Sequence, residues 1–342
     1  MAGNEGREDS TFGGHCGLVD LINMSEQTPN SDIVNLPGSG RDVQEGVEPL
    51  NELEQLQQLN NYFEDHYPEI FRSLTVDEGA EYRDKGEQVS ADLVDATERM
   101  WARVPDLLSH TSLLVLGAGL DHSMPHVAQI GPGTSVQPWT GPELPEGVVG
   151  QVIRPSQPTG VLAVSLHGGP GWFGDGVSHD QFWVPLFAAI AEASGTTVVD
   201  LTYPLPGYGD WTPTQEAVAQ AVEIIRSEES RQFGLITFGS GFIAAAGCLT
   251  AERTQPDFVV ALSPRITKEL ADQERMRVNG LPVLLSAAEQ DSRGTSLATA
   301  QDVLQDLGAD LTVQSWTAEH IIAPPSVWRE RVAAAARWIT QR

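Results

Sequence analysis

Apolar residues in the C-terminal part of the chain gather into short runs, which polar turns with glycine and proline separate. Such runs are typical of buried strands, and they cover residues 147–154, 161–166, 196–201, 233–238, 258–262, 282–286 and 311–316. Helical patterns lie between them, at residues 182–193, 214–226, 243–249, 297–307 and 326–340. Strands that alternate with helices predict a mostly parallel sheet with helices on both faces. We therefore expect an α/β domain over residues 127–342.

The N-terminal part of the chain has a different pattern. Residues 1–46 are rich in Gly, Asn, Ser, Asp and Glu and lack a sustained period, which predicts a disordered acidic tail. Apolar residues then recur at helical spacing over 50–71 and over 90–107, where Ser90 is a candidate N-cap. We interpret residues 47–126 as a helical cap or accessory segment.

Charge and composition narrow the classes of function. The chain has 20 Lys and Arg against 47 Asp and Glu, a net charge of −27, so it repels nucleic acid and anionic membranes. No apolar run is long enough to span a bilayer, and the N-terminus lacks the pattern of a secretory signal, so we expect a cytoplasmic protein. The surroundings of Cys16 and Cys248 indicate neither a disulfide nor a metal site, and we expect no metal and no cofactor.

A glycine loop directly follows the apolar run at 161–166. It consists of residues 167–171, with the sequence HGGPG. Glycine lets backbone N–H groups approach a ligand closely, and in acyl-transfer enzymes such a loop forms one side of an oxyanion hole. The candidate oxyanion donors are the backbone N–H groups of Gly168, Gly169 and Gly241.

Residues 127–342 resemble the α/β-hydrolase fold and, within it, the hormone-sensitive-lipase-like esterases. The resemblance rests on the HGG sequence at 167–169, on Trp172, on the GD pair at 174–175 and on Tyr203 and Leu205, which match the family's DYRLAPE segment. It implies a serine carboxylesterase that acts on small or medium acyl esters, with its triad in the order nucleophile, acid, histidine. The HGGPG sequence also resembles that of proline iminopeptidases, which need the same serine.

Two members of such a triad stand in suitable settings. Residues 288–291, AEQD, follow a buried strand and match the family's acid loop, which makes Asp291 the candidate acid. His320 follows the next strand, in a short loop before the last helix. In this role Asp291 orients the imidazole, and His320 serves as general base and then as general acid.

The nucleophile elbow is atypical, because residues 237–241 read TFGSG. A Gly-x-Ser-x-Gly elbow needs small residues two positions before and after its nucleophile. With Gly239 in the nucleophile's position, Gly241 is the second small residue, and the protein lacks a nucleophile. With Ser240 there, Phe238 and Phe242 occupy both small positions. Local sterics favour Gly239, whereas the presence of the other catalytic elements favours Ser240.

These two registers carry two hypotheses of function. One is a serine carboxylesterase in which Ser240 attacks the ester. The other is a catalytically inactive protein of this fold, a pseudoenzyme, that binds an apolar ligand or a partner. The candidate substrate pocket consists of residues near the glycine loop and the elbow, for which ordinary core packing is an equal alternative: His167, Trp172, Phe173, Tyr203 and Phe238.

Overall fold

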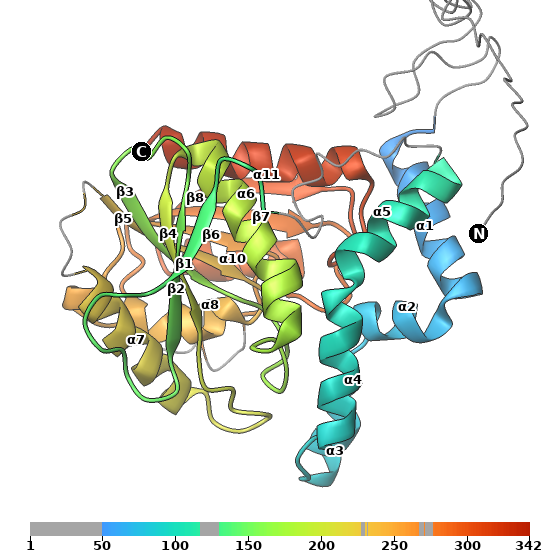
Figure 1. The fold of residues 1–342 in the computed structure, drawn as a ribbon, viewed down its shortest axis with the longest axis horizontal. Coiled ribbons are helices and arrows are strands. Elements are labelled where there is room, and N and C mark those ends of the chain that lie inside the picture. Colours follow the sequence, from blue (N-terminus) through green and yellow to red (C-terminus); the bar gives the residue numbers. More distant parts are fainter. Residues whose placement is uncertain (1–49, 117–129, 227–229, 231, 267–269, 271–275) are drawn as a thin grey trace, which may run out of the picture.

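The computed structural model describes residues 50–116, 130–226, 230, 232–266, 270 and 276–342. The expected tail at 1–46, which includes Cys16, therefore lies outside the described residues. Figure 1 shows a central sheet with helices on both sides, and a separate group of helices from the N-terminal part of the chain at one end.

The sheet contains eight strands in the order β1-β2-β4-β3-β5-β6-β7-β8. Strand β2 is antiparallel to β1 and β4, and the strands from β4 to β8 run parallel. The strands are β1 (Ser135–Pro138), β2 (Val149–Arg154), β3 (Val161–Leu166), β4 (Thr197–Thr202), β5 (Gln232–Phe238), β6 (Phe258–Leu262), β7 (Pro282–Ala288) and β8 (Asp310–Trp316). The mostly parallel sheet predicted from the alternating pattern is thus confirmed.

Helices cover both faces of this sheet because its central strands are apolar on both sides. In β6, for example, Val260 packs into one core and Val259 and Ala261 into the other. Helices α6 (Val184–Ser194) and α11 (Pro325–Thr340) cover the first face, and α7 (Thr212–Arg226) and α10 (Leu297–Asp306) cover the second. Short helices complete the connections: η1 (His179–Trp183), α8 (Gly241–Ala244), η2 (Ala245–Leu249) and η3 (Glu252–Thr254).

The segment before the sheet forms five helices in its described part, where the periodicity predicted two. They are α1 (Glu52–His66), α2 (Pro68–Thr75), α3 (Ala80–Lys85), α4 (Ala91–Ala102) and α5 (Val104–Leu116). Pro68 separates α1 from α2, because proline lacks the N–H that would continue the first helix and suits the first turn of the second. We call these five helices the accessory helices.

The accessory helices share a hydrophobic core with the sheet domain. Trp101 of α4 is buried against three aromatic rings, with its ring centroid 5.3 Å from that of Phe173, 5.8 Å from Phe182 and 5.7 Å from Trp183. The buried carboxylate of Glu98, one turn earlier, accepts hydrogen bonds from backbone N–H groups of the loop after β3. Among the helices described, none is both long and apolar enough to cross a membrane.

Candidate functional site

The carboxyl ends of neighbouring parallel strands meet at one edge of the sheet. Leu166 at the end of β3 pairs with Thr237 near the end of β5, and Ala288 at the end of β7 pairs with Trp316 at the end of β8. The loops after these strands therefore lie together. Ligands of open α/β sheets bind at this edge.

Asp291 and His320 form a buried hydrogen-bonded pair at this edge. His320 Nδ1 lies 2.9 Å from Asp291 Oδ1 and 3.0 Å from Oδ2. Asp291 Oδ1 also accepts hydrogen bonds from the backbone N–H groups of Arg293, at 2.9 Å, and Gly294, at 2.6 Å. Burial would raise the pKa of Asp291, but the charge and hydrogen bond of His320 and these two N–H groups lower it well below its usual range.

An ionised Asp291 determines the tautomer of the histidine. A carboxylate only accepts hydrogen bonds, so Nδ1 of His320 carries the proton that the pair shares. The other ring nitrogen, Nε2, then has a free lone pair when the imidazole is neutral. His320 lines the cavity described below, so the pair can hold or accept a proton there.

Gly239 has the backbone conformation that nucleophiles of this elbow adopt. Its φ is +53°, in the left-handed region, whereas Ser240 has an ordinary φ of −71° and ψ of −11°. A Cβ atom built on Gly239 would lie 3.9 Å from His320 Cε1 and 4.0 Å from Nε2. A side chain at position 239 would thus stand beside the imidazole, but the glycine provides none.

The hydroxyl of Ser240 is turned toward the glycine loop. Ser240 Oγ donates a hydrogen bond to the carbonyl oxygen of Gly169. No hydrogen bond joins Ser240 to His320 among the residues that the structure describes. The structure therefore brings together Asp291 and His320, and it places Gly239 beside the imidazole.

Of the candidate oxyanion donors, Gly169 lines the cavity together with Ser240. Gly241 instead packs against the end of β3, where an added Cβ would collide with the carbonyl oxygens of Leu166 and His167. Gly168 lies against the ring of Phe238, and a Cβ atom built on Gly168 would lie 2.9 Å from Phe238 Cδ1. The N–H group that directly follows Gly239 belongs to Ser240, and Gly241 is the corresponding donor only when Ser240 takes the nucleophile's position.

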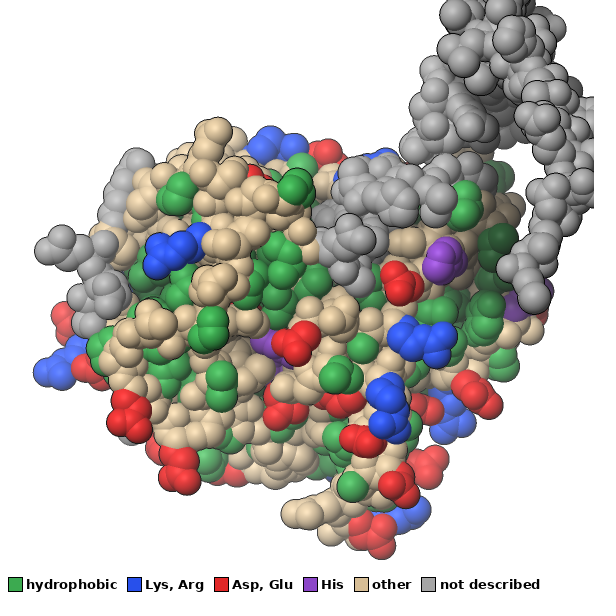
Figure 2. Space-filling view, viewed as in Figure 1, with side chains coloured by type: hydrophobic (Ala, Val, Ile, Leu, Met, Phe, Trp, Pro, Cys, Tyr) green, Lys and Arg blue, Asp and Glu red, His purple; other side chains and the backbone are tan. Residues whose placement is uncertain are grey.

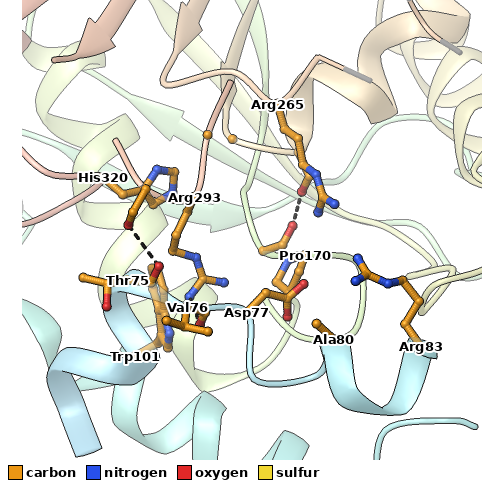
Figure 3. A pocket seen from close by; sticks show the side chains of 15 residues that line it. Thr75, Val76, Asp77, Ala80, Arg83, Trp101, Pro170, Arg265, Arg293 and His320 are labelled. Atoms are coloured by element: carbon orange, nitrogen blue, oxygen red, sulfur yellow. Dashed lines mark hydrogen bonds between the residues drawn. The ribbon is translucent and has the colours of Figure 1, made fainter. Parts of the chain in front are cut away.

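A cavity of about 410 Å³ opens in front of Gly239 and His320. This volume lies within the range of small-molecule sites. Its walls come from the accessory helices and from the loops after β3, β5, β6, β7 and β8, as Figure 3 shows for the labelled side chains. It is lined by Thr75, Val76, Asp77, Ala80, Arg83, Trp101, Gly169, Pro170, Gly239, Ser240, Arg265, Ser292, Arg293, Gly294 and His320.

The five residues predicted as a substrate pocket do not line this cavity. His167, Phe173, Tyr203 and Phe238 are buried in the core, and Trp172 lines a separate cavity beside Tyr208. Aromatic packing explains this correction: the His167 ring stacks on Tyr203 at 4.4 Å, and the Tyr203 hydroxyl donates to the His167 carbonyl oxygen at 2.7 Å.

His167 is a structural residue by its chemistry as well. Burial, together with the charge of nearby His179, lowers the pKa of His167 to about 3, so its ring stays neutral near pH 7. Its Nδ1 lies 2.7 Å from the carbonyl oxygen of Gly168 and holds the start of the glycine loop.

The accessory helices provide one wall of the cavity. The sequence pattern indicated a cap or accessory segment over residues 47–126 but did not identify which of its residues line the cavity. Trp101 of α4, which falls in the helical pattern at 90–107, is one of these lining residues. Three arginines of the cavity were missed too: Arg83, Arg265 and Arg293. The only sequence feature that pointed to any of them was the short charged segment between β6 and β7, which contains Arg265.

Comparisons with known proteins agree on the fold. No protein-family model matches this chain, and no curated protein matches its sequence. A thermostable esterase from Pseudomonas putida has 14% identity and a TM-score of 0.56, with coverage of 86% of this chain and 97% of that one. An esterase from the bacterial hormone-sensitive lipase family has 16% identity and a TM-score of 0.51, with coverage of 80% and 98%.

An esterase from Pyrobaculum calidifontis has a similar structure. It has 15% identity and a TM-score of 0.51, with coverage of 77% of this chain and 97% of that one. Together with the strand order and the elbow after β5, these likenesses confirm the α/β-hydrolase fold. At such low identity they show the fold alone.

Proposed function

We propose that this protein is a non-hydrolytic α/β-hydrolase-fold protein that binds a small molecule in the cavity beside Asp291 and His320. The observation that carries this proposal is the positive φ of Gly239, next to the imidazole, at the position of an elbow nucleophile. Glycine has no atom that can attack an acyl group, so the usual covalent route is closed.

The alternative, a serine carboxylesterase, requires Ser240 to take over the attack. Its hydroxyl would have to leave the Gly169 carbonyl and reach His320. Ser240 has helical φ and ψ at the start of α8, and a move to the elbow position would rebuild the turn after β5. The geometry therefore favours binding over acyl transfer.

The cavity keeps the features that recognise a polar ligand. His320 presents its ring at the base of the cavity, and its orientation is held by Asp291. The backbone at Gly169 and Ser240 lines the same cavity as His320. A small molecule with a polar head group fits this arrangement better than a wholly apolar one, because the described walls contain several charged side chains.

Labelling with a fluorophosphonate probe tests the proposal, together with turnover of p-nitrophenyl acetate. We expect no labelling of the wild-type protein and turnover no faster than that given by free imidazole. Gly239→Ser should gain labelling, because it places a hydroxyl beside His320. Gly239→Ala, which adds the Cβ without the hydroxyl, is the matched control and should stay unlabelled.

The opposite result identifies an esterase. If the wild-type protein is labelled and turns over the ester, and Ser240→Ala abolishes both, then Ser240 is a nucleophile and the proposal is wrong. Mass spectrometry of the labelled peptide distinguishes attack by Ser240 from attack by any other serine.

A further inference from the structure

The cavity beside Gly239 has an excess of positive charge, although the whole chain has a net charge of −27. Arg83, Arg265 and Arg293 line it, and Asp77 is the one carboxylate among its described lining residues. Figure 3 shows the three guanidinium groups directed into the same space from three different segments. Like charges in a partly desolvated space raise its potential and favour an anion there.

Asp77 offsets only part of this charge. Its Oδ1 accepts hydrogen bonds from Trp172 Nε1 at 3.0 Å and from the Tyr208 hydroxyl at 2.7 Å. The carboxylate is therefore engaged by two neutral donors at the side of the cavity. No ion pair joins it to an arginine among the residues described.

Two of the three arginines already have partners. Arg293 Nη1 donates to the carbonyl oxygens of Ser73, at 2.5 Å, and Val76, at 3.0 Å, and so ties the loop after β7 to the accessory helices. Arg83 Nε donates to Asp84 at 3.1 Å near the surface. These contacts hold the two side chains in place around the cavity.

Arg265 differs from both, because its guanidinium has no hydrogen-bond acceptor or carboxylate partner in the described part of the chain. The side chain is half-buried, and its backbone N–H donates to the carbonyl oxygen of Gly239 at 2.8 Å. Burial lowers the pKa of nearby Arg293, and the charge of Asp77 opposes this shift. The positive charge of Arg265 lowers the pKa of Arg293 further, because the guanidinium groups of Arg265 and Arg293 repel each other. An anion between them would relieve that repulsion.

The position of Arg265 is built into the fold. Ser263, two residues earlier, has a φ of +41°, which is uncommon for a residue with a side chain. Its hydroxyl accepts a hydrogen bond at 3.0 Å from Arg331 Nη2, and its N–H donates at 2.8 Å to the Ser286 carbonyl. This turn directs the chain after β6 toward the elbow, so that Arg265 meets Gly239.

We propose that the ligand of this cavity is a small organic oxyanion, whose carboxylate or phosphate group is bound by Arg265. The planar fork of a guanidinium matches two oxygens of either group. The rest of the ligand lies in the same cavity, against Gly239 and His320. This proposal rests on the proposed function in one respect only, that the cavity is a binding site.

Isothermal titration calorimetry at low ionic strength tests it with three probes of similar size. Hexanoate and butyl phosphate carry the oxyanion, and hexanamide is the neutral analogue of hexanoate. We expect at least one anion to bind at least tenfold more tightly than the amide. The tighter of the two anions identifies the head group as carboxylate or phosphate.

Substitution of Arg265 gives the second readout. Arg265→Gln keeps most of the side-chain length without the charge, and we expect it to weaken anion binding at least tenfold. Arg253→Gln is the matched control, because Arg253 is exposed in η3 and pairs with Glu223 at 3.1 Å, outside the cavity. Its anion affinity should equal that of the wild-type protein, and circular dichroism should show both variants folded.

Three results overturn the inference: equal affinity for hexanoate, butyl phosphate and hexanamide, unchanged anion affinity in folded Arg265→Gln, or no binding of any probe at millimolar concentration. Failure of the proposed function is a separate result. Fluorophosphonate labelling of the wild-type protein would show an enzyme, and an anion preference measured alongside would then describe its substrate.

Discussion

At the scale of single residues, two glycines of the elbow differ sharply in what they tolerate. Apart from its chain neighbours, a Cβ on Gly239 would meet no atom of the described residues closer than 3.6 Å. A Cβ on Gly241 would collide with the backbone of β3. The first glycine is needed only for its positive φ, and the second is needed for close packing.

This difference predicts unequal losses of stability. Gly239→Ser should lower the free energy of unfolding by about 1 kcal/mol, the usual cost of a side chain in the left-handed region. Gly241→Ala should cost about 3 kcal/mol, because the backbone of β3 has to move. Urea denaturation monitored by tryptophan fluorescence measures both, and equal losses would contradict this account of the elbow.

A buried charge pair behind the glycine loop sets a pH dependence. His179 Nε2 lies 3.0 Å from Asp200 Oδ2, and Ser165 Oγ donates to Asp200 Oδ1 at 2.6 Å. Burial alone would lower the pKa of His179, but the charges of Asp200 and Asp180 raise it to about 10.

The pKa of His179 is higher in the folded state than in the unfolded chain, where it is ~6.5. The contribution of His179 to the free energy of unfolding is therefore complete below pH ~6.5 and is lost as pH rises toward 10. Asp200 has a lowered pKa, and its own contribution is lost at acidic pH. We therefore expect the stability difference between wild type and His179→Gln to be largest near pH 6 and to shrink by pH 10. A difference that grows with pH would contradict the assignment.

At the scale of elements, Trp101 is a central contact between the accessory helices and the sheet domain. Trp101 packs on Phe173 and Trp183 of the sheet domain, and the guanidinium of Arg293 lies 5.4 Å from the centre of its ring. Glu98 accepts from the N–H groups of Gly174 at 2.6 Å and of Ser178 at 2.9 Å. The helix that carries both residues thus holds one wall of the cavity against the glycine loop.

Trp101→Ala should cost about 3–5 kcal/mol of unfolding free energy, as for other large buried aromatic residues. It should also make the accessory helices more sensitive to limited proteolysis than the sheet. Leu114→Ala on α5 is the matched control, because Leu114 is 67% exposed and should change stability by less than about 0.5 kcal/mol. Uniform proteolysis of both parts would show that the accessory helices do not depend on Trp101.

At the scale of the whole molecule, the surface is strongly acidic. Figure 2 shows carboxylates spread over the visible face, while several basic side chains lie over the accessory helices. With a net charge of −27, repulsion between carboxylates opposes the compact state.

Salt should therefore stabilise the protein. Raising sodium chloride from about 0.02 M to 0.5 M shortens the screening length from roughly 20 Å to a few ångströms. The melting temperature in differential scanning calorimetry should rise by several degrees. An unchanged or lower melting temperature would show that repulsion between surface charges is not a significant cost.

The sequence by itself determined the mostly parallel sheet and the order of β2 to β8 along the chain, whereas β1 (Ser135–Pro138) was not predicted. Apolar runs such as Val161–Leu166 and Phe258–Leu262 become buried strands wherever helices cover both faces, so the local pattern suffices. Asp291 and His320 were found in the same way, because each follows a strand, and the ends of parallel strands share one edge.

Only the tertiary structure shows the backbone conformation of residues 239 and 240 and what surrounds them. The motif TFGSG allows two registers, and the positive φ of Gly239, beside the ordinary φ of Ser240, is a property of the folded backbone that the motif does not contain. The three arginines of the cavity, Arg83, Arg265 and Arg293, lie far apart along the chain. Only folding brings their charges into one cavity. Sequence patterns report periodicity within an element, whereas a site made by several loops depends on long-range contacts that no local pattern contains.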